Sequence, residues 1–501
     1  HSYDTRNFLN DPKLGPEIIE AELEAKEEEQ LSKTDLNKIV MLVANKIEKN
    51  ITSLQGIEYL PNIEQAFLNQ ITLTDVDFSN NKELKYINIR GVNLNSMNLS
   101  QNLKLNRLIA SLSRNDKNLD LSHLTELRDL EIQNSGIKDI KLPNGITKVQ
   151  LRDNRISDII LPNTVSYLNL HSNKLTSIIL PASIEEVEVS SNEIENIIFN
   201  GNNLKILYAS GNAIKNIDLP EGLGSAQLGR NKIETITLPS TLNSLNLDDN
   251  KISNITLPSG VEYVRVSENN IENIVFSGKV KSLEANSNNI TNITLPEGIE
   301  NFELAGNKIE NITIPTSVKR LNLSGNKISN IDLPTNIETA ELNNNKISNI
   351  DLSKNNNLAV LGLYRNPLED IDVRNNPKLK SFQFFLKNSK DTIDFSNNPN
   401  LREVVIFGEE GAKIKSLDFS NNPDLYTLKL YSLGLTNLNL DNNIKLDEIT
   451  LKNNNLESLD LTNNTKLRYV TLYNNTSNLK LPVLTHNHKF EVEEHRKLKI
   501  K

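Results

Sequence analysis

The sequence contains no cysteine and no tryptophan, and aromatic residues make up only 5% of its 501 positions. The absence of cysteine excludes disulfides, thiolate metal sites, iron–sulfur clusters and cysteine nucleophiles. Lys and Arg total 55 against 64 Asp and Glu, so the net charge of −9 disfavours a nucleic-acid partner, which would require a basic surface. The longest apolar run, Ile39 to Ala44, is far shorter than the ~18 residues of a membrane helix. We therefore expect no membrane insertion of this segment.

Asparagine is abundant, with 78 residues or nearly one in six, and its positions are periodic. In the segment Leu242 to Asn250, apolar residues stand at positions 0, +3 and +5 of a unit, and Asn stands at +8. This Asn recurs, mostly every 19 residues, at Asn154, Asn173, Asn192, Asn212, Asn231, Asn250, Asn269, Asn288, Asn307, Asn326, Asn345 and Asn366. With flanking units of 21 to 24 residues, the pattern predicts 21 repeats.

Each repeat has a physical interpretation. Alternation at +3 and +5 predicts a short strand with one face inward. The Asn at +8 turns inward, where its amide satisfies backbone groups left unpaired by the turn, so that successive Asn residues form a ladder. The return leg is too short for a full helix, and prolines such as Pro258 favour polyproline II or 3₁₀ structure there.

The pattern resembles the leucine-rich repeat over about Ile63 to Leu481. The central Leu-Pro units are similar to those of the secreted YopM and IpaH effector families, whereas longer units such as Asp351 to Asn366 resemble repeats of Gram-positive surface proteins. The resemblance implies an α/β-type solenoid, a horseshoe with a parallel concave β-sheet and a mostly extended or 3₁₀ convex side.

Three regions are expected along the chain. Residues 1–60 form an N-terminal tail and helical cap, with helices at Glu17–Leu31 and from Thr34 or Asp35 through Asn45. Residues 61–482 form the solenoid of about 21 repeats, and residues 483–501 form a C-terminal cap or the start of a further domain. The segments Asp11–Leu14, Lys33–Leu36 and Ile51–Leu60 together resemble the cap and first repeat of internalin-like proteins.

No motif for chemistry stands out. We find no phosphate-binding loop, nucleophile elbow or zinc-protease motif, and we expect neither enzymatic activity nor a cofactor. His486 and His488, with His495 nearby, could ligate a metal, but no carboxylate or Cys stands at ligand spacing, so no metal site is expected.

A binding surface can be read from the variable positions +2, +4, +6 and +7, which face away from the core. Nine of the eleven tyrosines fall on these positions or on +1 at their edge, and aromatic residues cluster at +6 near the C-terminus. Exposed contiguous aromatic side chains favour a binding role over a fault in the repeat. The candidate ligand-binding residues are Tyr364, Phe385, Leu386, Val405, Phe407, Tyr431 and Tyr473.

The same repeats lack the ladder Asn, carrying Lys387, Glu409 and Leu433 instead, and they have longer loops at 388–392 and 408–413. Two other surfaces remain open as alternatives. One is an acidic stretch at +4 with Glu188, Glu284, Glu303 and Glu341, and the other is a smaller N-terminal patch with Phe67, Tyr86, Ile109 and Leu112.

The expected function is protein binding through the concave face, in a secreted or surface-displayed protein of a bacterium, with Gram-positive display and adhesion to a host or neighbouring cell implied by the resemblance. A secreted effector that scaffolds host proteins and a glycan-binding solenoid are the alternatives. Ligand identity and oligomeric state are not predicted.

Overall fold

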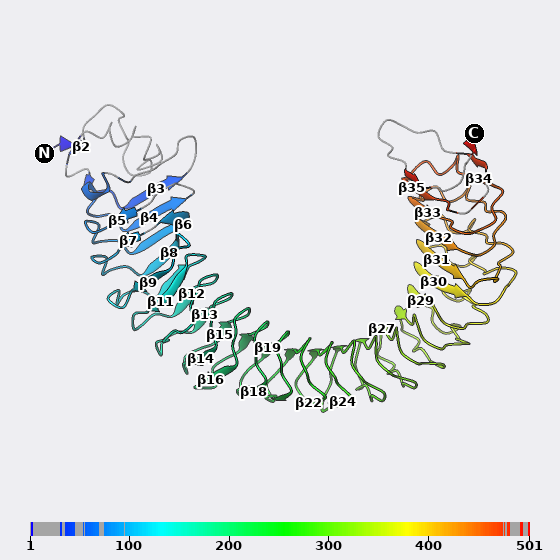
Figure 1. Cartoon of the computed structure of the whole chain (residues 1–501), viewed down its shortest axis with the longest axis horizontal. Helices are drawn as coiled ribbons and strands as arrows, with labels where there is room; N and C mark the ends of the chain where they lie inside the picture. Colours follow the sequence, from blue (N-terminus) through cyan, green and yellow to red (C-terminus); the bar gives the residue numbers. More distant parts are fainter. Residues whose placement is uncertain are drawn as a thin grey trace. The chain divides into compact units, whose positions relative to one another are not determined.

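The computed structural model describes residues 2–3, 31–32, 36–45, 54, 56–69, 75–94, 96–473, 475, 478–480, 491–493 and 499–500. The chain forms two compact units, His1–Asn250 and Lys251–Lys501. Each unit is a solenoid in which every turn supplies one strand to a parallel main sheet on the inner, concave side of the unit (Figure 1).

In the first unit, each strand of the main sheet pairs in parallel with the strand of the next turn. Its strands are β3 (Met41–Asn45), β4 (Gln65–Asn69), β6 (Tyr86–Leu94), β8 (Arg107–Leu112), β10 (Asp129–Ile132), β12 (Lys148–Gln150), β13 (Tyr167–Asn169), β15 (Glu186–Glu188), β17 (Ile206–Tyr208), β19 (Ser225–Gln227) and β21 (Ser244–Asn246).

The second unit follows the same rule of parallel pairing between successive turns. Its main-sheet strands are β23 (Tyr263–Arg265), β25 (Ser282–Glu284), β26 (Asn301–Glu303), β27 (Arg320–Asn322), β28 (Thr339–Glu341), β29 (Val360–Leu363), β30 (Ser381–Leu386), β31 (Glu403–Gly408), β32 (Thr427–Tyr431), β33 (Glu448–Thr450), β35 (Tyr469–Thr471) and β37 (Glu491–Glu493).

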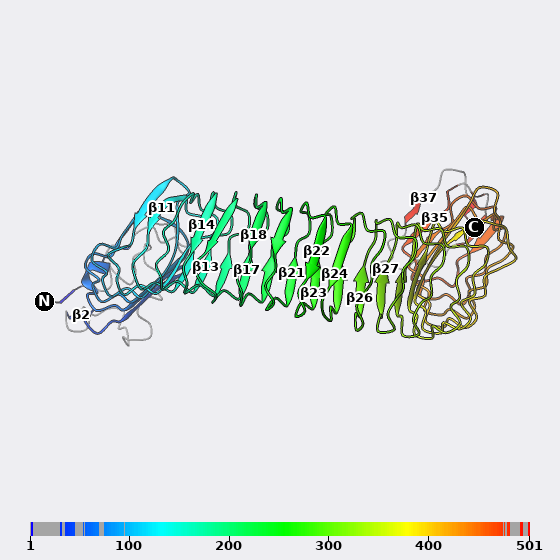
Figure 2. The ribbon, with the colours of Figure 1, turned by 90° about the horizontal axis from the view of Figure 1, so that it is seen from below.

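The return legs are extended segments and turns that form short parallel sheets on the outer side of each unit (Figure 2). In the first unit the pairs are β5 (Asp75–Asp77) with β7 (Ser96–Asn98), β9 (Lys117–Asp120) with β11 (Ile137–Lys141), β14 (Ser177–Leu180) with β16 (Asn196–Phe199), and β18 (Asn216–Asp218) with β20 (Thr235–Thr237). In the second they are β22 (Asn254–Leu257) with β24 (Asn273–Phe276), and β34 (Ser458–Asp460) with β36 (Asn478–Lys480) and β38 (Lys499–Ile500).

The N-terminal region differs from the expected pair of helices. The second expected helix is replaced by β3, because Ile39, Leu42 and Ala44 repeat the 0, +3, +5 spacing and add one more turn to the solenoid. Leu31 lies in β2 (Leu31–Ser32), which pairs antiparallel with β1 (Ser2–Tyr3), and the rest of the first expected helix lies outside the described residues. The described residues contain one short 3₁₀ helix, η1 (Ile57–Tyr59), ahead of β4.

The core is formed as the spacing predicts. In the repeat that begins at Val318, the side chains of Val318, Leu321 and Leu323 are at most 2% exposed. The return leg adds Ile328 and Leu333 to the same core. Because every turn contributes the same inward positions, the solenoid has one continuous apolar core along each unit.

The Asn ladder at +8 is confirmed. The Asn326 Nδ2 donates to the carbonyl oxygens of Leu304 and Leu323, each at 2.9 Å, and its Oδ1 accepts from the Ile309 N–H at 3.1 Å. Leu323 belongs to the same repeat, whereas Leu304 and Ile309 belong to the preceding one. One buried amide therefore joins two turns and satisfies three backbone groups.

The residue before the ladder Asn, at +7, closes the turn in the left-handed conformation. Twelve residues other than glycine at +7 have φ between 51° and 59°, and ten of them, including Glu268 and Arg365, precede a ladder Asn. Glycine takes the same position in other repeats, as at Gly306 and Gly325. This turn follows the strand and aims the next side chain into the core.

A second ladder, three residues before position 0, occupies the longer repeats and was not expected. The Asn376 Nδ2 donates to the carbonyls of Leu352 at 3.1 Å and Asn355 at 2.9 Å, one repeat earlier. The shorter repeats have proline at this position. In both the longer and the shorter repeats, the carbonyl of the residue three places before position 0 accepts the N–H of position 0. Asn376 accepts from Leu379 in this way, and Pro315 accepts from Val318. Asn and Pro thus close the same turn, and Asn adds a bond between repeats.

We predict that Asn326→Ala lowers the free energy of unfolding by about 1–3 kcal/mol, because it leaves buried backbone groups without partners. Asn330→Ala is the matched control, since Asn330 lies exposed in the same repeat and should have an effect within about 0.5 kcal/mol. Urea denaturation of both variants measures the difference. Equal losses would contradict the inward assignment of the +8 side chain.

Candidate functional site

The concave strands lengthen where the ladder is interrupted in the second unit. Strands β30 and β31 have six residues each, whereas the preceding β27 and β28 have three. Lys387 and Glu409 replace the ladder Asn, and neither Leu386 nor Gly408 adopts the left-handed turn at +7. Without the turn, the backbone continues in the extended conformation.

Four aromatic side chains at +6 lie together on this face, and we call Tyr364, Phe385, Phe407 and Tyr431 the aromatic stripe. The Phe407 and Tyr431 rings stack with centroids 4.3 Å apart and planes within 3°. Tyr364 lies 4.6 Å from Phe407 and meets Phe385 edge-on at 6.1 Å. All four rings are half-buried, so the stripe is a packed surface rather than a set of free side chains.

A cluster of buried phenylalanines lies below the stripe. Phe382 and Phe384 of β30 contact each other at 5.8 Å, and Phe382 meets Phe395 of the return leg at 5.4 Å. Phe395 in turn stacks on Phe419 at 5.5 Å. These side chains are at most 1% exposed, so they provide a rigid base for the aromatic stripe.

The three other candidate residues, Leu386, Val405 and Tyr473, differ in whether they reach the concave surface and whether they join the stripe. Leu386 was expected on the concave surface but is only 2% exposed, because the longer strand continues the alternation and turns +7 inward beside Phe382 and Phe384. Val405 is half-buried on the concave face, paired in register between Gln383 and Lys429. Tyr473 is also half-buried at +6, but Lys452 occupies the +6 position between it and Tyr431.

The two longer loops that follow β30 and β31 are paired with each other. The Lys390 N–H donates to the Lys413 carbonyl at 3.0 Å, and the Lys413 N–H donates to the Ser389 hydroxyl at 2.9 Å. The Lys390 ammonium, on a side chain only 15% exposed, pairs with Asp370 at 2.5 Å. Gly408 approaches Ser432 so closely that a Cβ would lie 2.1 Å from the Ser432 carbonyl oxygen. The interruption of the ladder is therefore replaced by other specific contacts.

Most acidic side chains at +4 have identifiable partners. Glu188 accepts the Ser190 N–H at 2.7 Å, Glu284 pairs with Arg265 at 3.2 Å, and Glu303 accepts the Asn286 Nδ2 at 3.3 Å.

Glu341 differs from the other acids at +4 in its electrostatic environment. Burial raises the pKa of its carboxyl, and repulsion from Glu403 acts in the same direction. The Asn343 Nδ2 donates to Glu341 at 3.2 Å and opposes part of this shift. Glu341 lies one strand before Tyr364, so the acidic stretch and the aromatic stripe meet there.

The N-terminal patch is smaller than expected. Phe67 and Tyr86 contact each other at 5.1 Å, and the Arg107 guanidinium lies 4.8 Å from the Tyr86 ring centre. Ile109 and Leu112 are at most 4% exposed, so neither contributes exposed surface to this patch.

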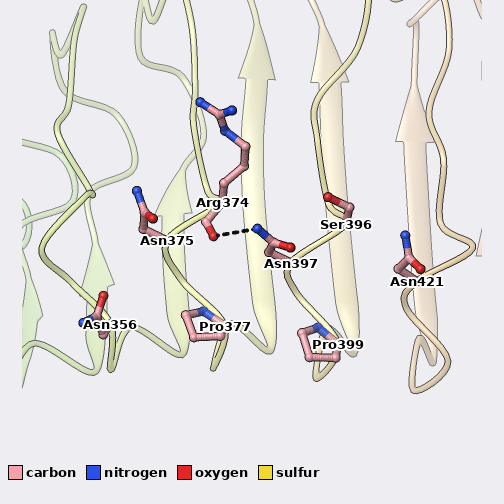
Figure 3. A pocket seen from close by; sticks show the side chains of 8 residues that line it. All are labelled: Asn356, Arg374, Asn375, Pro377, Ser396, Asn397, Pro399 and Asn421. Atoms are coloured by element: carbon pink, nitrogen blue, oxygen red, sulfur yellow. Dashed lines mark hydrogen bonds between the residues drawn. The ribbon is translucent and has the colours of Figure 1, made fainter.

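A polar groove of about 580 Å³ lies among the turns that precede the main-sheet strands of the second unit (Figure 3). Asn397 Nδ2 donates to the Arg374 carbonyl at 3.2 Å. The hydrogen bond from the Arg374 side chain lowers the pKa of the Asp372 carboxyl to about 2. These polar groups serve the turns of the repeats, so the aromatic stripe remains the candidate site. The lining residues are Asn356, Arg374, Asn375, Pro377, Ser396, Asn397, Pro399 and Asn421.

No group of three His, Asp or Glu side chains in the described part of the chain is arranged to hold a metal ion, and His486, His488 and His495 lie outside that part. None of its helices has the length and apolar character needed to cross a bilayer.

No family model and no curated protein sequence matches the chain. Among solved structures, YopM from Yersinia enterocolitica WA-314 is similar with a TM-score of 0.62 and 20% identity over 91% of each chain. The plant peptide hormone receptor RGFR1, in complex with RGF2, has a TM-score of 0.57 and 15% identity over 93% of each chain. The functional domain of InlJ from Listeria monocytogenes covers 96% of this chain and 77% of its own, with 19% identity and a TM-score of 0.34. The first two likenesses confirm the leucine-rich-repeat fold.

We predict that Glu341→Gln stabilises the protein at pH 7. The raised pKa means that the folded state binds this proton more tightly than the unfolded state, in which Glu titrates near 4.5. Protonation of Glu341 therefore adds stability below pH 4.5, and this contribution is lost as pH rises through the raised pKa. Urea denaturation at pH 7 and pH 4 should show a gain from the substitution that shrinks at the lower pH. A variant less stable than the parent at pH 7 would contradict the burial of this charge.

Proposed function

We propose that the chain is a non-catalytic protein-binding module whose principal contact surface is the aromatic stripe. Four rings on adjacent strands would present a continuous surface roughly 15 Å long at the ~4.8 Å spacing of strands. Aromatic side chains held in fixed positions are typical centres of protein interfaces, since they contribute large contact area at a low cost in conformational entropy. The single observation that carries this proposal is the packing of Tyr364, Phe385, Phe407 and Tyr431 against one another at the surface.

The arrangement of the rings favours a protein ligand over a glycan. A sugar stacks on an exposed ring face, but Phe407 and Tyr431 stack face to face at 4.3 Å and cover each other. What the stripe offers instead is ring edges and apolar surface, with Val405 beside them. Such a surface suits the apolar side chains of a protein partner.

A binding role also agrees with the use of polar side chains elsewhere in the repeats. Aspartates at one position of the longer repeats, such as Asp351, Asp394 and Asp418, each accept the N–H of the residue two places later. That residue is a serine in each case, and the hydrogen bond from its hydroxyl, followed by the bond from its N–H, lowers the pKa of each carboxyl. Carboxylates held ionised in this way stabilise turns and are poorly suited to act as general acids.

The biological setting that we propose is an exported bacterial protein, with surface display and adhesion to a host or neighbouring cell as the first choice. This choice rests on the resemblance of the repeats to those of Gram-positive surface proteins. The alternative is an effector delivered into host cells, which the Leu-Pro repeats and the likeness to YopM favour. Fractionation of the producing cell, with detection of the chain on intact cells or inside host cells, separates the two.

We predict that Phe385→Ala with Phe407→Ala weakens binding of a protein ligand by about 2 kcal/mol or more, roughly 30-fold in affinity. Ligands would first be found by screening the intact chain against cell-surface protein domains and glycans, and affinities then measured by surface plasmon resonance. Tyr208→Ala is the control, because Tyr208 is 37% exposed on the concave face of the first unit, outside the stripe. Denaturation curves should accompany the measurement, since the half-buried rings also contact each other.

Two binding results would contradict the aromatic stripe as the site of a protein ligand. If a ligand binds the double variant normally but loses affinity for Glu284→Gln with Glu303→Gln, the acidic stretch is the site and the stripe is not. If the hits are glycans that need Phe407 and Tyr431, the glycan alternative replaces the protein one.

A further inference from the structure

A glycine next to the aromatic stripe leaves a notch in the concave surface. Gly362 occupies the +4 position of β29, the strand followed directly by Tyr364, and the Glu341 side chain fills the missing volume. A Cβ on Gly362 would lie 2.2 Å from the Glu341 Oε2 and 2.9 Å from the Asn343 Nδ2. The carboxylate therefore lies over the strand that leads into the stripe rather than extending into solvent.

Asn343 holds this arrangement in place. Its Nδ2 donates to Glu341 Oε2 at 3.2 Å, and its Oδ1 accepts the Tyr364 N–H at 2.8 Å. One amide thus connects the carboxylate to the backbone of the first aromatic residue of the stripe. The position of Glu341 relative to the backbone of Tyr364 is therefore set by these bonds within the protein.

The charge of Glu341 has no basic partner within the described part of the chain. Two other acids on this face are paired, Glu338 with Arg320 at 3.3 Å and Glu448 with Lys429 at 3.5 Å. Arg365, which follows Tyr364 in the sequence, places its guanidinium 5.4 Å from the centre of the Tyr364 ring. Glu341 is left with the amide of Asn343, with repulsion from Glu403 and with a partly desolvated carboxylate.

We propose that Glu341 is the acceptor for a basic side chain of the protein that lies on the aromatic stripe. This inference rests on the proposed function and specifies the partner's chemistry: an Arg or Lys beside an apolar or aromatic residue. A carboxylate that is already desolvated and oriented loses little on binding, so a charge-assisted hydrogen bond there contributes more than one from an exposed Glu. The apolar neighbour packs on the stripe while the cation pairs with the carboxylate that lies in the notch.

Short peptides can test the notch without knowledge of the natural ligand. The probe is acetyl-arginyl-glycyl-tryptophan amide, and its matched control carries citrulline, a neutral isostere, in place of arginine. Because the chain has no tryptophan, the peptide's fluorescence anisotropy reports binding directly. We expect the arginine peptide to bind about tenfold more tightly than the citrulline peptide.

Variants separate this inference from the proposed function. Glu341→Gln should make the two peptides bind equally, and Gly362→Ala should do the same by displacing the carboxylate from the notch. Glu403→Gln, which neutralises a neighbouring acid outside the notch, should preserve the preference for arginine. The double change Phe385→Ala with Phe407→Ala should weaken both peptides together.

The outcomes that overturn the inference are distinct. If both peptides bind the parent protein equally and still need the two phenylalanines, the stripe is a binding site but Glu341 is not its cation acceptor. A preference for arginine that survives Glu341→Gln, or that disappears only with Glu403→Gln, assigns the cation to another acid. Failure of both peptides to bind also rejects the inference, whereas the stripe is tested separately with its protein ligand.

Discussion

The buried amide at +8 is the constraint on which the rest of each unit depends. A 19-residue turn cannot satisfy its own backbone, because the residues after the strand turn inward and leave carbonyl and N–H groups in the core. The side chain of Asn326 reaches three such groups in two consecutive repeats. To aim it inward, the preceding residue must adopt the left-handed conformation, which costs a non-glycine residue on the order of 1–3 kcal/mol. Residues such as Glu268 and Arg365 adopt this conformation although each carries a Cβ.

The central part of the aromatic stripe, Phe385 and Phe407, follows from relaxing this constraint, whereas Tyr364 and Tyr431 still precede left-handed residues. Where Lys387 and Glu409 replace the ladder Asn, the left-handed turn is lost, the strand gains residues and +6 becomes part of an extended ribbon. Side chains at +6 on neighbouring strands then stand in register, as Phe385, Phe407 and Tyr431 do. The same change sends Leu386 into the core. An interrupted ladder thus creates both a flatter surface and a larger hydrophobic base beneath it.

The fold follows from the sequence to the extent that it depends on spacing. The periodic Asn and the 0, +3, +5 pattern predict the parallel sheet, the inward amide and the buried core. Three features need more than spacing. The run from Ile39 to Ala44 fits a helix or a strand equally well as a short apolar segment, and only pairing with β4 decides for a strand. Leu386 could be assigned inward only by knowing that the turn at +7 is absent. The second ladder was visible as Asn three residues before position 0, as at Asn376, but its role requires the carbonyls of the previous turn.

The candidate site, like the fold, follows from the sequence only in part. Sequence indicates that aromatic residues gather at +6 and that acids occupy +4, but it does not indicate that the two sets meet at Gly362. The absence of a side chain there lets Glu341 lie across the strand toward Tyr364, so that a partly buried charge stands at the end of an apolar surface. Such a charge destabilises the free protein, since burial raises its pKa without a basic partner to offset the desolvation. A solenoid with a continuous core and two ladders can tolerate this local loss. Under the proposed interaction, a basic side chain of the partner would supply the charge that Glu341 lacks and offset this local loss of stability.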